Sequence, residues 1–308
     1  IMDMTYDDEN AYFGFLRAYQ RNPDWPIHKF SSTNTYQYGE CILLHFLAEY
    51  YCGGCPSMVV DIWEACVQNE LSNEPDYIEA IDQVIQEYSW GRDNLHDALK
   101  EFSVWRTVTG DRDTGVHFHD GALWPSGASL VMDSTLDGTS LTLPATVEPN
   151  KAPYDYGFSY VRIENPQAIT GAMALQFTGD PVVDWAVTLI QTRDNYKTLI
   201  QRELPLSTGS GIMVINPGML QQADDLTVAI VNLGTDQFDP DTGQDGLRRD
   251  FTITLLDAQP DTSLQLWTAQ PASCIGMTYM LHSEFEHYGV PTSYDYWLFL
   301  EINGEFFT

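Results

Sequence analysis

Basic residues are scarce in this sequence. Its 308 residues include 14 Lys and Arg against 44 Asp and Glu, which gives a formal net charge of −30. Because contact with phosphate groups needs basic side chains, this balance excludes a protein that binds nucleic acid by electrostatic attraction. It also argues against docking on anionic lipid. Acidity spread over the whole chain is typical of a salty or calcium-rich exterior, although an ordinary acidic protein would show the same totals.

Long apolar runs are also missing. No stretch of about eighteen consecutive apolar residues occurs, so the sequence predicts no transmembrane helix. No signal peptide is recognisable. The chain opens with Ile1 instead of methionine, and we expect a processed terminus or the start of a trimmed product. With 44% hydrophobic residues, the chain is long enough for two packed domains.

Cysteine is rare too, and four of the five cysteines fall within residues 38–66. Apolar residues at three- and four-residue steps predict one helix before Gly53-Gly54 and a second helix after Pro56. Because the link is so short, the two helices should lie nearly antiparallel.

The spacing of these cysteines predicts two disulfides. In each helix the two cysteines are eleven residues apart, close to three helical turns. When the hairpin folds, Cys52 meets Cys55 at the turn. Cys41 meets Cys66 at the other end, about 16 Å away. Two groups so far apart cannot surround one zinc ion, and a CxxC redox motif would normally follow a strand. Reduced core thiols are the main alternative to the two bridges, and Cys274 is left over.

The spacing of apolar residues divides the chain into a helical part and a β part. The helical period of 3.6 changes to the strand period of two after residues 110–127. We therefore predict an α+β fold: an all-helical subdomain at residues 1–125, then an antiparallel β-sandwich at residues 126–308. Further helices are predicted at residues 9–19 and 76–88 and after Asn94. Strands are predicted at residues 140–143, 158–164, 172–177, 185–191, 198–204, 211–215, 226–232, 251–256 and 294–302. Residues 257–291 are harder to assign, and two predictions are open for them: a short helix near residues 281–287, or a long excursion of the sandwich.

An acidic loop is the candidate metal site. Asp239, Asp241, Asp245 and Asp250 lie around glycines in the segment DPDTGQDGLRRD. Carboxylates at alternate positions supply the hard oxygen ligands that calcium prefers. The EF-hand pattern is not met, because Gly243 stands where a ligand is expected. The alternative is a solvated acidic hairpin loop between two strands.

Other residues supply no convincing catalytic motif. His117 and His119 would share one side of an extended segment, but a third ligand is not visible, and exposed loop histidines beside Asp120 are favoured. The histidines of residues 282–287 have the wrong spacing for an inverted zinc motif. Two interpretations, a carbohydrate platform and ordinary sheet core, are open for four tryptophans: Trp124, Trp185, Trp267 and Trp297.

A series of short motifs runs from Met2 to about residue 255. In chain order they are Met2-Asp3-Met4-Thr5-Tyr6, Asn10-Ala11-Tyr12, Tyr38-Gly39, Phe46-Leu47, Val60-x-Ile62-Trp63-Glu64, Ala80-Ile81, Phe102 with Trp105 and Arg106, Thr109-Gly110-Asp111-Arg112, Gly121-x-x-Trp124-Pro125 and Tyr156-Gly157-Phe158-Ser159-Tyr160. Each motif is unspecific alone. Their order resembles the C-terminal portion of a family of secreted bacterial zinc metallopeptidases of the gluzincin type. The resemblance implies a helical subdomain that forms one wall of a peptidase cleft, followed by a β-sandwich.

The zinc-binding helix of that family is absent. Such peptidases carry zinc on an HExxH helix with a third ligand Glu further along. None of the seven histidines here is followed by Glu. In the family the zinc helix precedes the segment that matches residues 2–12. No catalytic residue is therefore assigned, and zinc is expected only in an intact parent enzyme.

Two functions are open from the sequence. The chain is either the C-terminal part of a secreted zinc-metallopeptidase-like protein, with peptide hydrolysis only if an HExxH lobe lies upstream, or an extracellular structural, adhesive or binding protein without enzymatic activity. A protein or polypeptide partner suits both hypotheses; self-association or a carbohydrate partner suits the second. The predicted disulfides favour an extracellular or secreted location, the cell surface included.

Overall fold

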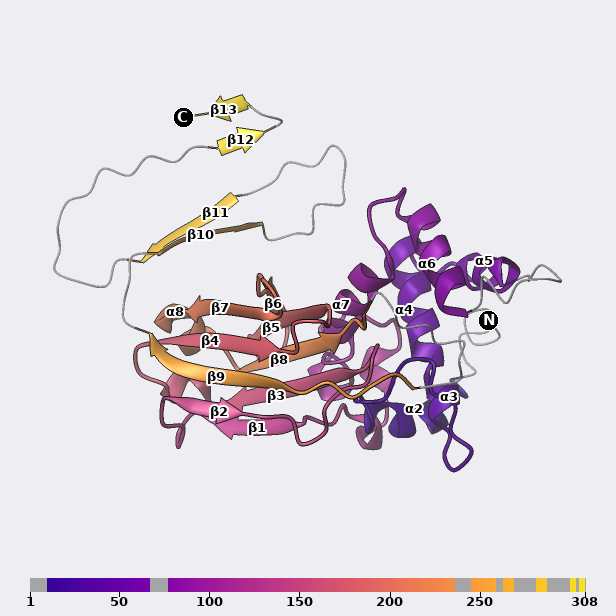
Figure 1. Ribbon diagram of the computed structural model, residues 1–308, viewed down its shortest axis with the longest axis horizontal. Coiled ribbons are helices and arrows are strands. Elements are labelled where there is room, and N and C mark those ends of the chain that lie inside the picture. The colour runs from indigo at the N-terminus through magenta and orange to yellow at the C-terminus, as the bar shows by residue number, and fades with distance from the viewer. Residues whose placement is uncertain are drawn as a thin grey trace. The chain divides into compact units, whose positions relative to one another are not determined.

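The computed structural model describes residues 10–66, 77–235 and 245–258, and the backbone of four short strands further along. By residue contacts the chain separates into two compact units, Ile1–Asp257 and Ala258–Thr308. The first unit contains the described helices and two stacked sheets (Figure 1). The predicted boundary between residues 125 and 126 falls inside this unit, and the division into those two domains stays a prediction.

Helices dominate the first part of the described chain. Gly53 adopts a left-handed conformation at the end of α4, and the amide of Gly54 returns to the carbonyl of Ala48 at 2.9 Å, which closes the helix as a glycine pair should. Asn94 and Asp97 form a capping box that starts α7. Both boundaries confirm the sequence-based expectation. The helices are α2 (Phe13–Gln20), α3 (Tyr36–Gly39), α4 (Cys41–Cys52), α5 (Ser57–Ala65), α6 (Tyr77–Tyr88) and α7 (Leu95–Trp105).

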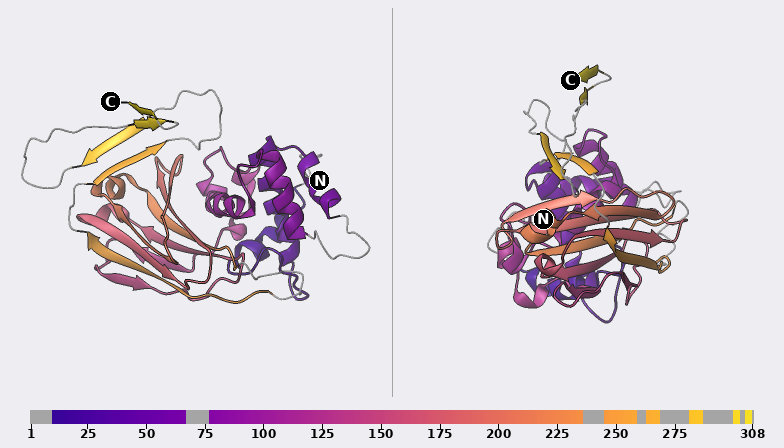
Figure 2. Two further views of the ribbon diagram at one scale, coloured as in Figure 1. Left: turned by 45° about the horizontal axis from the view of Figure 1, so that its top comes forward. Right: turned by 90° about the vertical axis from the view of Figure 1, so that its left-hand side faces the viewer.

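Two sheets form the β part, one with the strand order β1-β3-β8-β5-β6 and the other with the order β2-β9-β4-β7. Strand β1 runs parallel to β3, and the other registered pairs run antiparallel. The sheets face each other, with the helices gathered at one side (Figure 2). The strands are β1 (Ser134–Asp137), β2 (Ala145–Val147), β3 (Phe158–Glu164), β4 (Ala172–Gly179), β5 (Trp185–Arg193), β6 (Thr198–Glu203), β7 (Ser210–Ile215), β8 (Asp225–Asn232) and β9 (Phe251–Ala258), with a short helix α8 (Pro217–Gln222) before β8.

The α+β fold class is confirmed, and the seven strands β3 to β9 end within two residues of their predicted bounds. The strand predicted at residues 140–143 is wrong. Thr139 donates its amide and its hydroxyl to the Asp137 carboxylate, at 3.0 and 2.8 Å, and this local turn replaces strand pairing.

Among the later predictions, the helix near residues 281–287 is also wrong. Residues Leu281–Glu286 form strand β11, which pairs antiparallel with β10 (Ser263–Thr268). Of the strand predicted at residues 294–302, the structure describes Leu300–Ile302 as β12, paired with β13 (Glu305–Phe307). Residues 294–299, Cys274 and His287 lie outside the described residues.

The five-stranded sheet contributes to two hydrophobic cores at once. Successive side chains of a strand point to opposite faces. On β3, Phe158 and Tyr160 pack in the core shared with the helices, whereas Val161 and Ile163 pack between the two sheets. Strands β5 and β8 divide their side chains in the same way. The helical part and the sandwich are therefore joined by continuous packing.

Arg106 is fully buried at this joint. Its guanidinium lies 4.6 Å from the ring centroid of Tyr19 and 5.0 Å from that of Phe158, and its Nε donates to Gln20 Oε1 at 2.9 Å. Cation–π attraction strengthens when the cation is removed from water. Arg106 thus holds α2, α7 and β3 together without a carboxylate among its hydrogen-bond partners.

Helices α2 and α3 approach each other so closely at Gly39 that a side chain would not fit. A Cβ atom there would lie 2.6 Å from Tyr19 Cβ and 2.8 Å from the Phe15 carbonyl oxygen. We predict that Gly39→Ala lowers the free energy of unfolding by about 1–3 kcal/mol, as overpacking does. Gly14→Ala is the control, since nothing lies within 4 Å of its Cβ, and we expect it to stabilise helix α2 by about 0.5–1 kcal/mol. Urea unfolding of both variants measures the difference; equal stability of the two would contradict the close approach.

Candidate functional site

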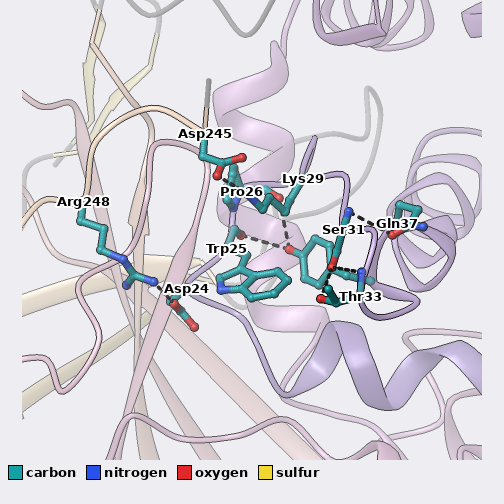
Figure 3. A network of polar contacts seen from close by, with 10 residues as sticks. Asp24, Trp25, Pro26, Lys29, Ser31, Thr33, Gln37, Asp245 and Arg248 are labelled. Carbon is teal, nitrogen blue, oxygen red and sulfur yellow. Dashed lines mark hydrogen bonds and ion pairs between the residues drawn. The ribbon is translucent and has the colours of Figure 1, made fainter. Parts of the chain in front are cut away.

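One of the two described carboxylates of the predicted calcium loop is paired with a protein cation. Asp245 forms an ion pair with Lys29, and nearby Arg248 reaches Asp24 with an Nη2–Oδ2 distance of 2.7 Å (Figure 3). Asp250 is exposed, and the other two predicted ligands, Asp239 and Asp241, lie outside the described residues. Calcium at this loop would share Asp245 with Lys29, and the site stays a prediction.

The predicted disulfide between Cys52 and Cys55 is present, with Cα atoms 5.5 Å apart. The two glycines between these cysteines have positive φ angles of 66° and 92°, which allows the chain to turn within three peptide bonds. Cys41 and Cys66 are half-buried and pack against the helical core. The second bridge, Cys41–Cys66, stays a prediction.

The two histidines after α7 occupy different environments. His117 is half-buried with its ring edge against Trp105, and burial lowers its pKa to about 4. Its Nδ1 lies 2.6 Å from Thr114 Oγ1. The side chain of His119 is 71% exposed beside Asp120, and its backbone amide donates to Glu49 on α4. Within the described ranges, no three His, Cys, Asp or Glu side chains come together as a metal site requires.

The described tryptophans among the four candidates for a sugar platform are core residues. Trp124 and Trp185 are each 5% exposed, the first in the helical core and the second between the sheets. The side chain of Trp267 and the whole of Trp297 lie outside the described residues. Exposed indoles occur elsewhere, at Trp63 and Trp90.

A cluster of two arginines and one aspartate lies where the outer face of the five-stranded sheet emerges from beneath the helices. Arg112, at the end of the 3-10 helix Gly110–Arg112, makes a bidentate pair with Asp225 at 2.6 and 2.9 Å. Arg162 Nε, from β3, lies 3.7 Å from Asp225 Oδ2. The Thr192 hydroxyl donates to the same carboxylate at 2.7 Å. The Asp225 side chain is 4% exposed, so it is the buried centre of the cluster.

Strained backbone surrounds this cluster. Asp194, Asn195 and Tyr196 form the β5–β6 turn with three successive φ angles of 58°, 55° and 63°. The last of these is costly for a bulky side chain. It places the Tyr196 ring 4.8 Å from the Arg112 guanidinium, and Asp224 accepts the Tyr196 amide at 3.0 Å. The turn thus braces Arg112 from the sandwich side.

A cavity of about 260 Å³ opens beside the two arginines. Its walls also include apolar side chains from the segment after α7 and several hydroxyl groups. The residues that line the cavity include Thr109, Arg112, Trp124, Pro125, Ser126, Ser129, Leu130 and Arg162. Arg112 and Trp124 belong to the sequence motifs described above, whereas the sequence alone assigned no role to Arg162 or Asp225. The available signal was a charged residue on the same face of the strand FSYVRIE as the apolar Phe158 and Tyr160.

A second unusual group is the carboxyl of Glu40, between α3 and α4. Tyr77 Oη donates to Glu40 Oε1 at 2.7 Å. Burial raises the pKa of Glu40 to about 8, and the hydrogen bond from Tyr77 opposes this only in part. The folded protein therefore holds a proton on Glu40 near neutral pH.

Comparisons with known proteins assign no family. No protein-family model matches the chain, and no curated protein matches it. Among solved structures, the 1.0 Å crystal structure of the pre-peptidase C-terminal domain of collagenase from Bacillus anthracis matches in part, with a TM-score of 0.27 and 5% sequence identity. The match covers 41% of this chain and 96% of that domain. Of the helices that the structure describes, none combines the length and the apolar character needed to cross a membrane.

We predict that Asp225→Ala lowers the free energy of unfolding by about 3–5 kcal/mol, because the change leaves two partly buried guanidinium groups without their shared anion. Asp111→Ala is the matched control, since Asp111 is exposed at the same 3-10 helix, and its effect should stay within about 0.5 kcal/mol. Chemical denaturation of both variants is the measurement. A loss below about 1 kcal/mol in Asp225→Ala would show that the cluster is not a structural centre.

Glu40 predicts a pH dependence of stability. Its pKa is raised above the ordinary value of 4.5 in the folded protein, so the folded state binds more protons than the unfolded state between about pH 4.5 and 8. Stability therefore falls as the pH rises through this window. Glu40→Gln keeps an acceptor for Tyr77 without the charge, and we expect its stability loss between pH 5.5 and 8 to be smaller than that of wild type by about 1–3 kcal/mol.

Glu64→Gln is the control for this measurement. Glu64 is exposed on α5, and its substitution removes the same net charge. Urea unfolding at the two pH values compares the three proteins. The prediction fails if Glu40→Gln and Glu64→Gln show the same pH dependence.

Proposed function

We propose that this chain is the helical subdomain and β-sandwich of a secreted gluzincin-like metallopeptidase, and that it serves as a rigid, non-catalytic wall beside a catalytic lobe located upstream of Ile1. The ordered motifs of the sequence support this proposal. The observation that carries it is where those motifs lie. In the described chain, several of them lie where elements pack together: Arg106 and Phe158 meet at the joint between helices and sheet, whereas Trp63 is exposed.

Three motif residues illustrate this placement. Gly39 allows the close approach of α2 and α3. Arg106 stacks between rings of α2 and β3, and Arg112 is paired with Asp225 on β8. Contacts of this kind make the packing of neighbouring elements rigid. The wall of a substrate cleft needs such rigidity, because a cleft keeps its geometry only if its walls do not move.

The described residues do not fit the zinc of such a peptidase. The chain has no HExxH segment, and its described His, Cys, Asp and Glu side chains form no group of three. In the proposal, the metal and the attacking water belong to the upstream lobe, and this chain supplies a surface for the polypeptide substrate. Motif residues 2–6 lie outside the described residues.

A binding protein without chemistry is the second candidate. The specific observation in its favour is the cavity beside Arg112 and Arg162, which lies between helices and sheet and is lined by both charged and apolar groups. Such a mixed, partly enclosed site is typical of small-ligand recognition. The two candidates differ in whether a longer product gains peptidase activity.

The test compares the 308-residue chain with a longer product that includes the upstream coding region of its source DNA. We expect the chain alone to bind no stoichiometric zinc and to leave casein intact. The longer product should bind about one zinc per chain and cleave casein. Replacing the Glu of its HExxH by Gln should abolish cleavage while zinc stays bound. Casein cleavage by the chain alone, or an upstream region without HExxH, would overturn the proposal.

A further inference from the structure

The outer face of the five-stranded sheet changes character along its strands. Toward one end, Phe158 and Tyr160 of β3 lie beneath the helices. Two residues further along β3 the same face carries Arg162, whose partner across the ladder is Thr227 of β8. Thr227 is fully buried, and its hydroxyl oxygen has no hydrogen-bond partner among the described residues. A polar patch thus follows directly on an apolar one.

The positive charge of this patch exceeds its buried negative charge. Arg112 and Arg162 share a single carboxylate, Asp225, which also accepts from Thr192. Asp111 at the cavity and Glu164 at the end of β3 are exposed to water, and the half-buried Asp224 accepts the Tyr196 amide. Burial, and then the charge of Arg112, lower the pKa of Arg162. Asp225 and Glu164 act in the opposite direction on this pKa, and of these two carboxylates only Asp225 is buried.

Buried donors in the same cavity lack acceptors. Arg162 Nε and Trp124 Nε1 both have no hydrogen-bond partner among the described residues, and Trp124 is only 5% exposed. Both residues line the cavity. Buried donors in native proteins normally have an acceptor, which is a protein group, an ordered water or a bound ligand. Two donors and an excess cation around one cavity indicate a ligand that is negative and accepts hydrogen bonds.

The shape of the site selects among anions. A guanidinium presents paired N–H groups that match the two oxygens of a carboxylate. Pro125 and Leu130 add apolar surface, and Thr109, Ser126 and Ser129 add hydroxyl groups. A volume of about 260 Å³ holds one small organic group. A polyanion is disfavoured, because the whole chain carries a formal charge of −30.

We propose that the cavity between Arg162, Arg112 and Trp124 binds the carboxylate of a small organic acid or of a peptide C-terminus, with Arg162 as the anchoring cation and the Trp124 indole as a second donor. Arg112 remains paired with Asp225 and positions the site. The aliphatic part of the ligand packs on Pro125 and Leu130. This inference goes beyond the proposed function and does not depend on an upstream lobe.

The test is a titration of the purified chain with N-acetyl-Ala-Ala-Leu as the free acid, followed by the NMR signal of the Trp124 indole N–H, which Trp124→Phe identifies. We expect the free acid to shift this signal saturably and the C-terminal amide of the same peptide to leave it unchanged. N-acetyl-leucine, as a free organic acid, distinguishes the two sources of carboxylate. Tighter binding of the peptide assigns the site to a C-terminus, and equal binding assigns it to small acids.

Arg162→Met should weaken binding of the free acid at least about tenfold, as loss of a charge-assisted bidentate contact does. Arg162→Lys keeps the charge but not the fork, and should fall between that variant and wild type. Arg92→Met is the matched control, an exposed arginine outside the cavity, and should bind like wild type. The melting temperature of each variant confirms that it is folded.

Three results would overturn the proposal. The first is a free acid and an amide that shift the signal equally, or not at all. The second is unchanged affinity in a folded Arg162→Met protein. The third is inorganic phosphate that saturates the site as tightly as the peptide acid, which would make it a general anion site instead of a carboxylate site.

Discussion

The shared use of one sheet by two cores is the constraint on which the structure of the first unit depends. Because side chains alternate along a strand, β3, β5 and β8 must be apolar on both faces where helices cover them. Phe158 and Tyr160 serve one core, and Val161 and Ile163 serve the other. The helical part cannot be removed without exposing an apolar sheet face. Within the first unit, the helices and the two sheets are therefore joined by continuous packing.

The polar contacts at the joint follow from the same arrangement. Arg106 fills the space between α2, α7 and β3 with a cation whose neighbours are rings. Arg112 links the 3-10 helix after α7 to the sheet through the buried carboxylate of Asp225 on β8. Removing Asp225 would leave the guanidinium groups of Arg112 and Arg162 partly buried without a counter-charge. Arg106, in contrast, is stabilised by aromatic rings that belong to the apolar core. The Arg112–Asp225 contact is therefore the more vulnerable to single substitution.

Local patterns predicted most of the fold, and distant pairing decided the rest. Strand β3 was predictable because its apolar residues and its bounding turns lie within one short segment. Strands β1 and β2 are edge strands of four and three residues, too short to show a period. The helix predicted near residues 281–287 failed because strand pairing with β10 overrides local propensity. The arginine cluster could not be predicted either: Arg162 meets Asp225 only through the register of β3 on β8.

Basic residues are scarce in this chain, so two arginines beside one cavity, Arg112 and Arg162, are an unusual feature. Several cations of this chain form ion pairs within the protein, among them Lys29 with Asp245, Arg248 with Asp24 and Arg249 with Asp180. A protein of formal charge −30 repels anions close to its surface, because salt screens this repulsion beyond the Debye length of about 8 Å in physiological salt. A ligand with one carboxylate is repelled weakly and gains the short-range contact with Arg162. A polyanion is repelled more strongly, because each of its charges adds to the repulsion. The acidic surface thus acts as a filter that leaves small monoanions as the ligands which the cavity can hold.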